Sequence, residues 1–120
     1  AIDTDPSYIN AYMGRASIFA EDRDFIAASD DYDKVIKIKK NYADAYKARG
    51  LMSMQLKNFK LAVSDFTEYM ELTNPNPFIL YQRGVANILS NNLLNACLDF
   101  GAAQDLGYKD AETAIKRFCN

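Results

Sequence analysis

The stretch that decides the fold runs from Ala43 to Asn76 and reads ADAYKARGLMSMQLKNFKLAVSDFTEYMELTNPN. Its apolar residues fall into two blocks, in which they recur at the three- and four-residue intervals of one helix face. The short polar turn at Lys57 and Asn58 separates the two blocks. The segment therefore predicts a pair of short amphipathic helices joined by a tight turn.

The same pattern recurs on both sides of this segment, at a shift of 34 residues. The aligned sets are Tyr12/Tyr46/Leu80, Ala16/Gly50/Gly84, Phe25/Phe59/Leu93, Ala28/Ala62/Ala96, Tyr32/Phe66/Phe100 and Ile38/Leu72/Leu106. Small residues on the first helix let the second helix approach closely, and the aromatic rings fill the space beside them. Helix-turn-helix units at a constant period of this length are typical of a helical solenoid.

On these residues the chain resembles the tetratricopeptide (TPR) repeat family. The resemblance covers three repeats, at residues 9–42, 43–76 and 77–110. It implies a single all-α domain over residues 1–120: a right-handed helical-repeat solenoid of antiparallel helix pairs, with about seven helices. Residues 1–8 align with residues 35–42, so we expect them to be the tail of a preceding repeat or an N-terminal lead-in.

The repeats depart from the family pattern in places. The large residue at Phe19 is replaced by Ser53 and Asn87, and the usual loop proline is absent at Lys40 and Tyr108. Residues 109–120 leave the repeat pattern, and their single apolar stripe predicts a capping helix that covers the end of the array. The stretch LGYKDAE also resembles the Sel1-like branch of helical repeats, which is an alternative family label with the same architecture.

Before the capping helix, the sequence predicts six helices. They are Ser7–Glu21, Phe25–Lys39, Ala43–Leu56, Phe59–Thr73, Phe78–Ser90 and Leu93–Leu106. The second helix of each repeat follows Asp24, Asn58 or Asn92, residue types that cap helix N-termini. Gly107 is placed to end the sixth helix in a left-handed conformation.

Two charged positions also recur at the 34-residue period. One set is Arg15, Arg49 and Arg83, and the other is Asp31, Asp65 and Asp99. Their separation within each unit predicts an Arg–Asp link between the paired helices. The alternative is a ladder of arginines that binds an anionic ligand. Because each of the three arginines occurs together with an aspartate in the same repeat, the structural interpretation is favoured.

Composition argues against several classes of function. The formal charge of −2 and the pI near 5.0 argue against a nucleic-acid surface, which needs a basic stripe. No apolar run approaches the length of a membrane span. We expect a soluble protein of the cytoplasm or periplasm, from a bacterial source.

The sequence supports no catalytic, cofactor or metal site. It contains no histidine, which removes the commonest general base and metal ligand. The glycines form no phosphate loop. The acidic cluster Asp30, Asp31 and Asp33 lacks the glycine and closing glutamate of a calcium loop, so we interpret it as a solvated helix face. We expect no enzyme activity and no cofactor.

The two cysteines, Cys97 and Cys119, lie in apolar helical contexts in the last repeat and the cap. We expect buried free thiols. A disulfide is the alternative, because those two elements should touch.

Binding is the function that remains. A stack of helix pairs has a concave surface lined by the first helix of each repeat. The candidate partner-binding residues on it are Asn10, Met13, Ser17, Asp44, Lys47, Leu51, Met54, Phe78, Tyr81, Gln82 and Val85. Aromatic and methionine side chains in a groove suit an extended peptide or a partner helix, although the residues near Phe78 and Val85 could equally be packing residues of the last repeat.

The TPR resemblance also permits an exclusion. In the best-known TPR groove, lysine, asparagine and arginine clamp the C-terminal carboxylate of chaperone tails. The corresponding residues here are Met13, Ser17, Ala48, Phe78 and Gln82. None of them carries a positive charge, so we expect that chaperone tails do not bind.

We therefore predict a non-catalytic protein–protein interaction module within a longer chain. The alternative is a structural segment of a longer repeat array, or a self-association element without its own ligand. In that case an N-terminal face formed by Ile9, Tyr12 and Phe19 would be uncovered.

Overall fold

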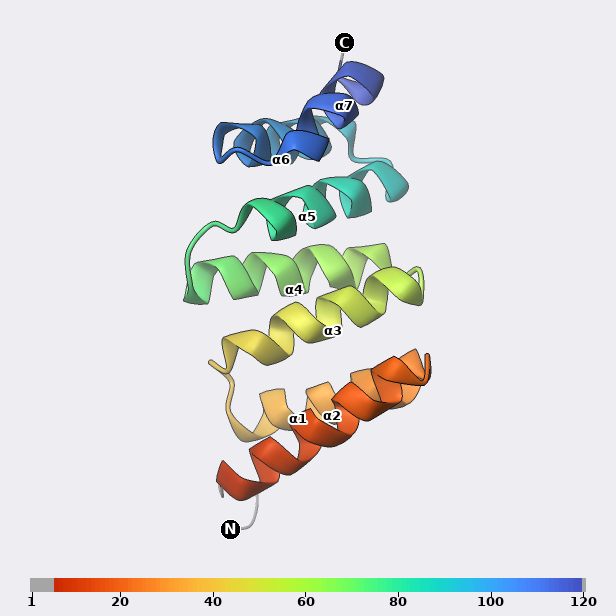
Figure 1. The fold of residues 1–120 in the computed structure, drawn as a ribbon, viewed down its shortest axis with the longest axis vertical. Coiled ribbons are helices and arrows are strands. Elements are labelled where there is room, and N and C mark those ends of the chain that lie inside the picture. The colour runs from red at the N-terminus through yellow and green to blue at the C-terminus, as the bar shows by residue number, and fades with distance from the viewer. Residues whose placement is uncertain (1–5, 120) are drawn as a thin grey trace.

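The computed structural model describes residues 6–119, with seven α-helices and no strand within that range. The helices are α1 (Pro6–Glu21), α2 (Phe25–Ile38), α3 (Ala43–Gln55), α4 (Phe59–Leu72), α5 (Pro77–Leu89), α6 (Leu93–Asp105) and α7 (Lys109–Phe118). They stack in chain order along the longest dimension of a 52 × 26 × 21 Å molecule (Figure 1). The expected all-α class is confirmed. The prediction for residues 1–5 lies outside the described residues.

The predicted helix boundaries are correct to within one residue for the first six helices. Both helices with a nearby proline, α1 and α5, begin on it at Pro6 and Pro77. Proline suits the first helical position because no intrahelical partner exists there for its missing N–H. The predicted last residues of α2 to α6 are instead the C-cap residues, namely Lys39, Leu56, Thr73, Ser90 and Leu106.

The predicted N-caps are only partly correct. The Asp24 carboxylate accepts a hydrogen bond from the Ala27 amide at 3.2 Å. Asn58 and Asn92 stand at the N-cap positions of α4 and α6, but their side chains make no capping bond. The asparagine that does cap a helix is Asn76, whose Oδ1 accepts from the Ile79 amide at 3.1 Å. Gly107 has the expected left-handed conformation, with φ of 92°.

The paired helices meet where a small residue on the first helix faces a ring on the second. A Cβ added at Gly50 would lie 2.6 Å from Cε1 of Phe66, and one at Gly84 would lie 2.6 Å from Cε1 of Phe100. Both rings are fully buried. Glycine at these positions therefore sets how closely α3 approaches α4 and how closely α5 approaches α6.

An arginine joins the two helices of every pair, as the sequence predicts. In the first pair, Arg15 Nε and Nη2 donate to Asp31 Oδ2 and Oδ1 at 2.8 and 2.7 Å. The same two-pronged contact recurs between Arg49 and Asp65 at 2.9 and 2.7 Å. It recurs again between Arg83 and Asp99 at 3.0 and 2.7 Å. The structural interpretation of these arginines is confirmed.

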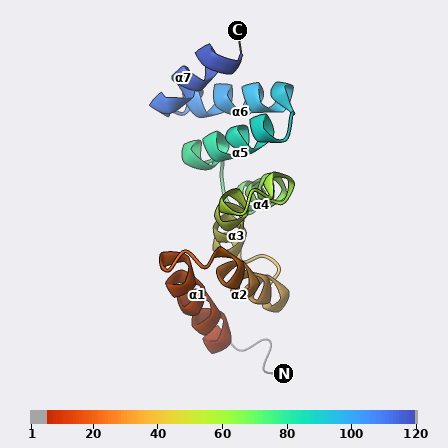
Figure 2. The same ribbon diagram turned by 90° about the vertical axis from the view of Figure 1, so that its right-hand side faces the viewer.

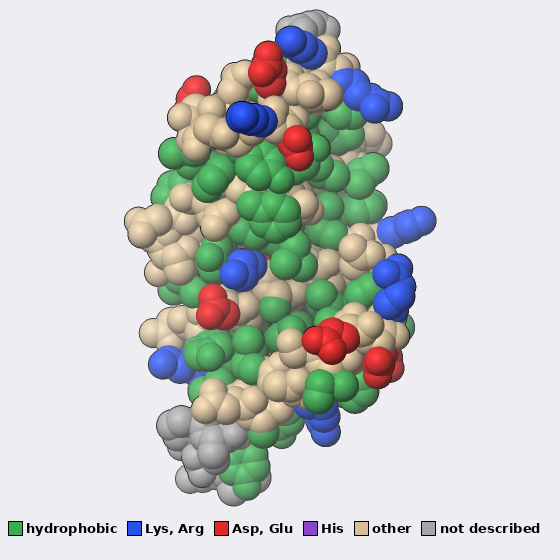
Figure 3. Space-filling model, in the orientation of Figure 1, with side chains coloured by type: hydrophobic (Ala, Val, Ile, Leu, Met, Phe, Trp, Pro, Cys, Tyr) green, Lys and Arg blue, Asp and Glu red, His purple; other side chains and the backbone are tan. Residues whose placement is uncertain are grey.

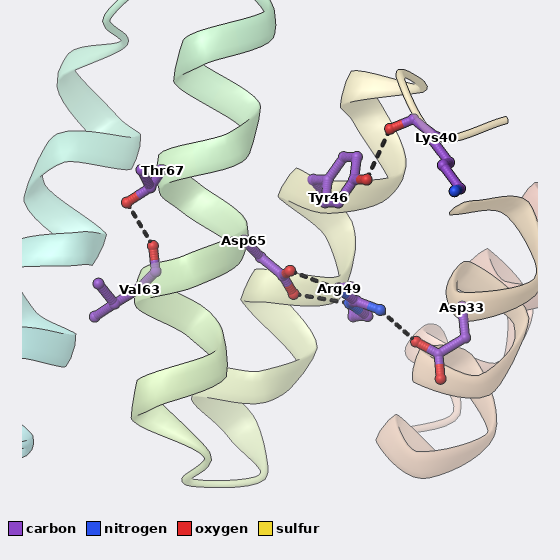
Figure 4. Close-up of polar contacts among 7 residues, drawn as sticks. All are labelled: Asp33, Lys40, Tyr46, Arg49, Val63, Asp65 and Thr67. Carbon is purple, nitrogen blue, oxygen red and sulfur yellow. Dashed lines mark hydrogen bonds and ion pairs between the residues drawn. The ribbon is translucent and has the colours of Figure 1, made fainter. Parts of the chain in front are cut away.

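The third nitrogen of two arginines reaches the preceding repeat. Arg49 Nη1 donates to Asp33 Oδ1 at 2.7 Å, so its guanidinium lies between two carboxylates (Figure 4). Arg83 Nη1 donates to Thr67 Oγ1 at 3.0 Å, and that hydroxyl donates in turn to the Val63 carbonyl. These contacts link neighbouring repeats as well as paired helices.

The solvated-face interpretation of the acidic cluster is wrong for two of its three members. Asp31 is buried and bound to Arg15, and Asp33 is half-buried and bound to Arg49; Asp30 alone is exposed. The hydrogen bonds from Arg15 lower the pKa of Asp31. For Asp65, burial raises the pKa of the carboxyl against the opposing effect of its hydrogen bonds from Arg49.

The expectation of free thiols is also wrong. Cys97 on α6 and Cys119, the C-cap residue of α7, form a disulfide with Cα atoms 5.8 Å apart. The two elements touch, as the alternative supposed, and the bond fastens the end of α7 to α6.

We predict that Gly84→Ala destabilises the protein. The added methyl must displace the buried ring of Phe100, at a cost of about 2 kcal/mol, which exceeds the gain of about 1 kcal/mol in helix propensity. Gly14→Ala is the matched control, because nothing lies within 4 Å of its Cβ position, and it should stabilise. Urea denaturation followed by circular dichroism measures both; equal effects would show that the close approach is unimportant.

We predict that Arg49→Met costs about 3 kcal/mol of unfolding free energy, because it leaves the buried Asp65 carboxylate unpaired. Arg15→Met should cost clearly less. The Arg15 side chain is 54% exposed, whereas that of Arg49 is 18% exposed and binds two aspartates. Thermal and urea denaturation give the comparison. A loss at Arg15 equal to that at Arg49 would contradict the assignment of Arg49 as the principal link.

Candidate functional site

The odd-numbered helices form one side of the stack. Figure 2 shows α1, α3, α5 and α7 on one side and α2, α4 and α6 on the other. On the odd-numbered side, α1 and α7 project further than α3, so this side is concave. We call it the concave face. Figure 1 looks onto it, and Figure 3 shows the same view with side chains.

The eleven candidate residues come from α1, α3 and α5, with different degrees of exposure. Asn10, Ser17, Asp44 and Phe78 are exposed, and Met13, Lys47, Leu51, Met54, Tyr81, Gln82 and Val85 are half-buried. Several of the second group also pack against the core. Leu51 and Met54 contact the cluster around Phe66, and Met13 contacts Ala16 and Tyr32. These residues present only part of their surface to a partner.

Hydrophobic side chains are concentrated toward one end of the concave face. In Figure 3 they gather at the level of α5, with charged side chains above and below them. A series of aromatic contacts explains this. Ring centroids lie 6.3 Å apart for Phe78–Tyr108, 5.1 Å for Tyr108–Tyr81, 5.6 Å for Tyr81–Phe100 and 6.4 Å for Phe100–Phe118. These rings join α5, α6 and α7 into one aromatic cluster.

In the middle of the concave face, the ammonium group of Lys47 makes a cation–π contact with the ring of Tyr69. Lys47 Nζ lies 5.4 Å from the ring centroid of Tyr69, which belongs to α4. Such a contact orients the ammonium group without neutralising it. Asp44, one turn earlier on α3, is exposed. The centre of the face is therefore polar, unlike its aromatic end.

A pocket of about 310 Å³ opens between α5 and α7. Its lining residues are Tyr81, Asp110, Thr113, Ala114, Arg117 and Phe118. Sequence reasoning missed all of these except Tyr81, because α7 was assigned to end-capping alone. The available signal was the spacing of Asp110, Thr113 and Arg117, which places them on one side of a helix.

A second pocket, of about 350 Å³, lies between α4, α5 and α6. Arg83, Asn87 and Asp99 contribute polar groups to it. These groups already bind one another: Arg83 donates to Asp99, and Asn87 Nδ2 donates to Asp99 Oδ2 at 3.0 Å. The polar groups of these three residues are therefore already bound to one another within the repeat.

The predicted uncovered N-terminal face is wrong in its residues. Ile9 is buried against Val35 and Ala45, and Tyr12 and Phe19 are half-buried. Ile18 is the most exposed of the large apolar residues described on α1, at 61%. It lies on a different side of the helix from the residues that the sequence indicated.

The described residues hold no group of three or more His, Cys, Asp or Glu side chains arranged to bind a metal. Between Pro6 and Cys119, no helix is long and apolar enough to cross a membrane. Neither observation adds a site to the concave face.

Among curated proteins, the chain is similar to the RNA polymerase II-associated protein 3 of Xenopus laevis. The two are 33% identical over 75 residues, which is 62% of this chain and 11% of that protein. No protein-family model matches the chain. Since this chain spans only about a tenth of the relative, the similarity concerns one part of that larger protein.

Solved TPR domains are similar over almost the whole chain. The second TPR domain of human RPAP3, solved with the HSP70 peptide SGPTIEEVD, has a TM-score of 0.85 and 20% identity, covering 95% of this chain and 97% of that one. The Arabidopsis OM64 TPR domain has a TM-score of 0.82 and 22% identity, covering 92% and 96%. The first TPR of Spaghetti (RPAP3), bound to the HSP90 peptide SRMEEVD, has a TM-score of 0.79 and 18% identity, covering 97% and 99%.

These comparisons do not support a bacterial source, because the curated relative is from a frog and the solved structures come from animals, a plant and bacteria. At such low identities, likeness to solved structures is evidence for the fold alone. The fold is a TPR-type helical-repeat solenoid.

Proposed function

We propose that this chain is a non-catalytic protein–protein interaction module that binds a peptide or a partner helix on its concave face. The observation that carries the proposal is the aromatic end of that face, where the exposed ring of Phe78 contacts Tyr108 and the half-buried ring of Tyr81 lines an open pocket. Rigid rings beside a pocket are typical anchors of an interface. The eleven candidate residues form the proposed contact surface.

Similar structures that hold peptides support a peptide as the ligand. TPR domains of RPAP3 were solved with peptides of HSP90 and HSP70. A type III secretion chaperone with the same fold was solved with a peptide of its translocator. One neighbour is part of an O-GlcNAc transferase, of which this chain covers 22%; so small a share carries no transferase activity over to this chain.

We propose residues 1–120 as one domain, with repeats at 9–42, 43–76 and 77–110 and a cap at 109–120. Helix pairs α3/α4 and α5/α6 each fall within one of these repeats, whereas α1 of the first pair begins at Pro6, before the first repeat. Cytoplasmic or periplasmic location remains a prediction from the sequence.

A structural segment of a longer repeat array is the second candidate. Ala11 on α1 is exposed, whereas Ala45 and Ile79 in the same register on α3 and α5 are fully buried against the preceding repeat. Among the described residues, Arg15 Nη1 also lacks the contact that Arg49 makes to Asp33. A further helix packed on α1 would cover Ala11 and complete the contacts of Arg15.

We predict that Phe78→Ala weakens peptide binding by about tenfold or more, because truncating an aromatic anchor typically costs over 1 kcal/mol. Peptides selected from a random dodecapeptide phage library, using the whole chain as bait, would be measured by fluorescence anisotropy. Leu94→Ala is the matched control, since Leu94 is 73% exposed on α6, away from the concave face. Binding that depends on Leu94 instead would move the site to the other face, and failure to select any peptide would favour the structural segment.

We also predict that the peptide SRMEEVD does not bind this chain at micromolar concentrations. The positions of the carboxylate clamp hold Met13, Ser17, Ala48, Phe78 and Gln82, none of which is cationic. The first TPR of Spaghetti (RPAP3), which has a similar structure, was solved with this same peptide, so the prediction separates this chain from that domain. Anisotropy with labelled SRMEEVD decides it, and micromolar binding that survives amidation of the peptide C-terminus would reveal a different mode of recognition.

A further inference from the structure

The pocket between α5 and α7 contains the fourth arginine of the repeating series. Arg117 follows Arg83 at the same interval that separates Arg15, Arg49 and Arg83. The first three are structural, because each binds an aspartate of the helix paired with its own. The surroundings of Arg117 are different in two respects.

First, no aspartate among the described residues binds Arg117 in the way that the other three arginines are bound. The residue after it is Phe118, where the three repeats have Ala16, Gly50 and Gly84. At Gly50 and Gly84 even a Cβ atom would lie 2.6 Å from the ring of the paired helix. The ring of Phe118 instead stacks on Phe100 of α6, with centroids 6.4 Å apart, and within the described residues no helix pairs with α7 as α4 pairs with α3.

Second, the preceding repeat offers Arg117 no acceptor. Arg49 reaches Asp33 and Arg83 reaches Thr67, but the residue in the same register on α6 is Gly101, which has no side chain. Within the described residues, Arg117 contacts the ring of its neighbour Phe118, with Cζ 5.4 Å from the ring centroid. Its guanidinium donors are therefore available at the edge of the pocket.

The pocket supplies a setting in which an anion can be bound. Tyr81 and Phe118 form apolar walls, and Thr113, one turn from Arg117 on the same side of α7, adds a hydroxyl. Asp110 opposes an anion, but it lies seven residues from Arg117, about 10 Å along the helix. Lys116 forms an ion pair with Glu112, with Nζ 3.2 Å from Oε1. The positive end of the pocket is thus at Arg117.

We propose that Arg117 binds the carboxylate of an acidic side chain in the peptide held by the concave face, with Tyr81 and Thr113 beside it. A guanidinium presents two parallel donors to a carboxylate, a geometry that the chain itself uses in its three structural Arg–Asp pairs. The proposal rests on the proposed function, and it assigns the ligand a negative charge at the C-terminal end of the groove.

The competing role for Arg117 is purely structural. It lies in the last turn of α7, where a cation interacts favourably with the helix dipole. That role predicts lower stability for a neutral variant but no change in which peptides bind. A binding measurement therefore separates the two roles, whereas a stability measurement does not.

The test uses the same random dodecapeptide phage library on four forms of the whole chain: the parent, Arg117→Gln, Asp110→Asn and Lys116→Gln. The parent should select peptides enriched in Asp or Glu at one position. Arg117→Gln should lose that enrichment and bind the parent-selected peptide about tenfold more weakly. Lys116→Gln, which removes the adjacent charge, should retain both, and Asp110→Asn should not weaken binding. Circular dichroism verifies that each form is folded.

A second arm of the test changes the peptide instead of the protein. Replacing the enriched acidic residue of the selected peptide by its amide should weaken binding to the parent about tenfold and leave binding to Arg117→Gln unchanged. Peptides that bind the parent without acidic enrichment, or that bind Arg117→Gln equally well, would overturn this inference while leaving the interaction module intact. A parent that selects no peptides at all would overturn the proposed function itself.

Discussion

The arginine that spans each helix pair is the constraint on which the rest of the structure depends. Arg49 binds Asp65 through two nitrogens and Asp33 through the third, so one side chain fixes a helix pair internally and against its neighbour. Burying such a pair adds little net stability by itself, because desolvation offsets most of the attraction. The pair does restrict the geometry, however. The arginine guanidinium is planar, so both of its hydrogen bonds to the carboxylate form only when the two helices have one particular relative position.

The close packing of the pairs follows from that position. Once the arginine fixes the register, Gly50 lies opposite Phe66 and Gly84 opposite Phe100, at distances that leave no room for a side chain. The 34-residue period that places each arginine opposite an aspartate also places each of these glycines opposite a phenylalanine ring. For this reason the helices, their pairing and the Arg–Asp links could be predicted from the sequence: each rests on residues recurring at one interval.

Two kinds of feature could not be predicted in this way: backbone details that the residue type does not indicate, and contacts of the segment that departs from the repeats. Arg23, Lys57 and Asn91 lie at equivalent positions in the turns within the helix pairs and adopt positive φ, although none is a glycine, because the tight connection imposes that conformation. Asn58 and Asn92 have the residue type of an N-cap without making its bond. The Cys97–Cys119 disulfide and the pocket on α7 depend on how the last helix packs, and the repeat pattern carries no information about a segment that departs from it.

The departure of α7 from the repeat pattern determines which arginine has hydrogen-bond donors available for a ligand. In each of the three repeats the arginine binds an aspartate of the paired helix, and in the second and third repeats it also binds the preceding repeat, so the repeated pattern confines it to a structural role. Among the described residues no helix pairs with α7 to supply an aspartate, and the acceptor position on α6 is occupied by Gly101, which has no side chain. The same residue type, in the same register, is then left beside an open pocket. A change in the neighbours, rather than in the arginine, converts a structural position into a candidate site of recognition.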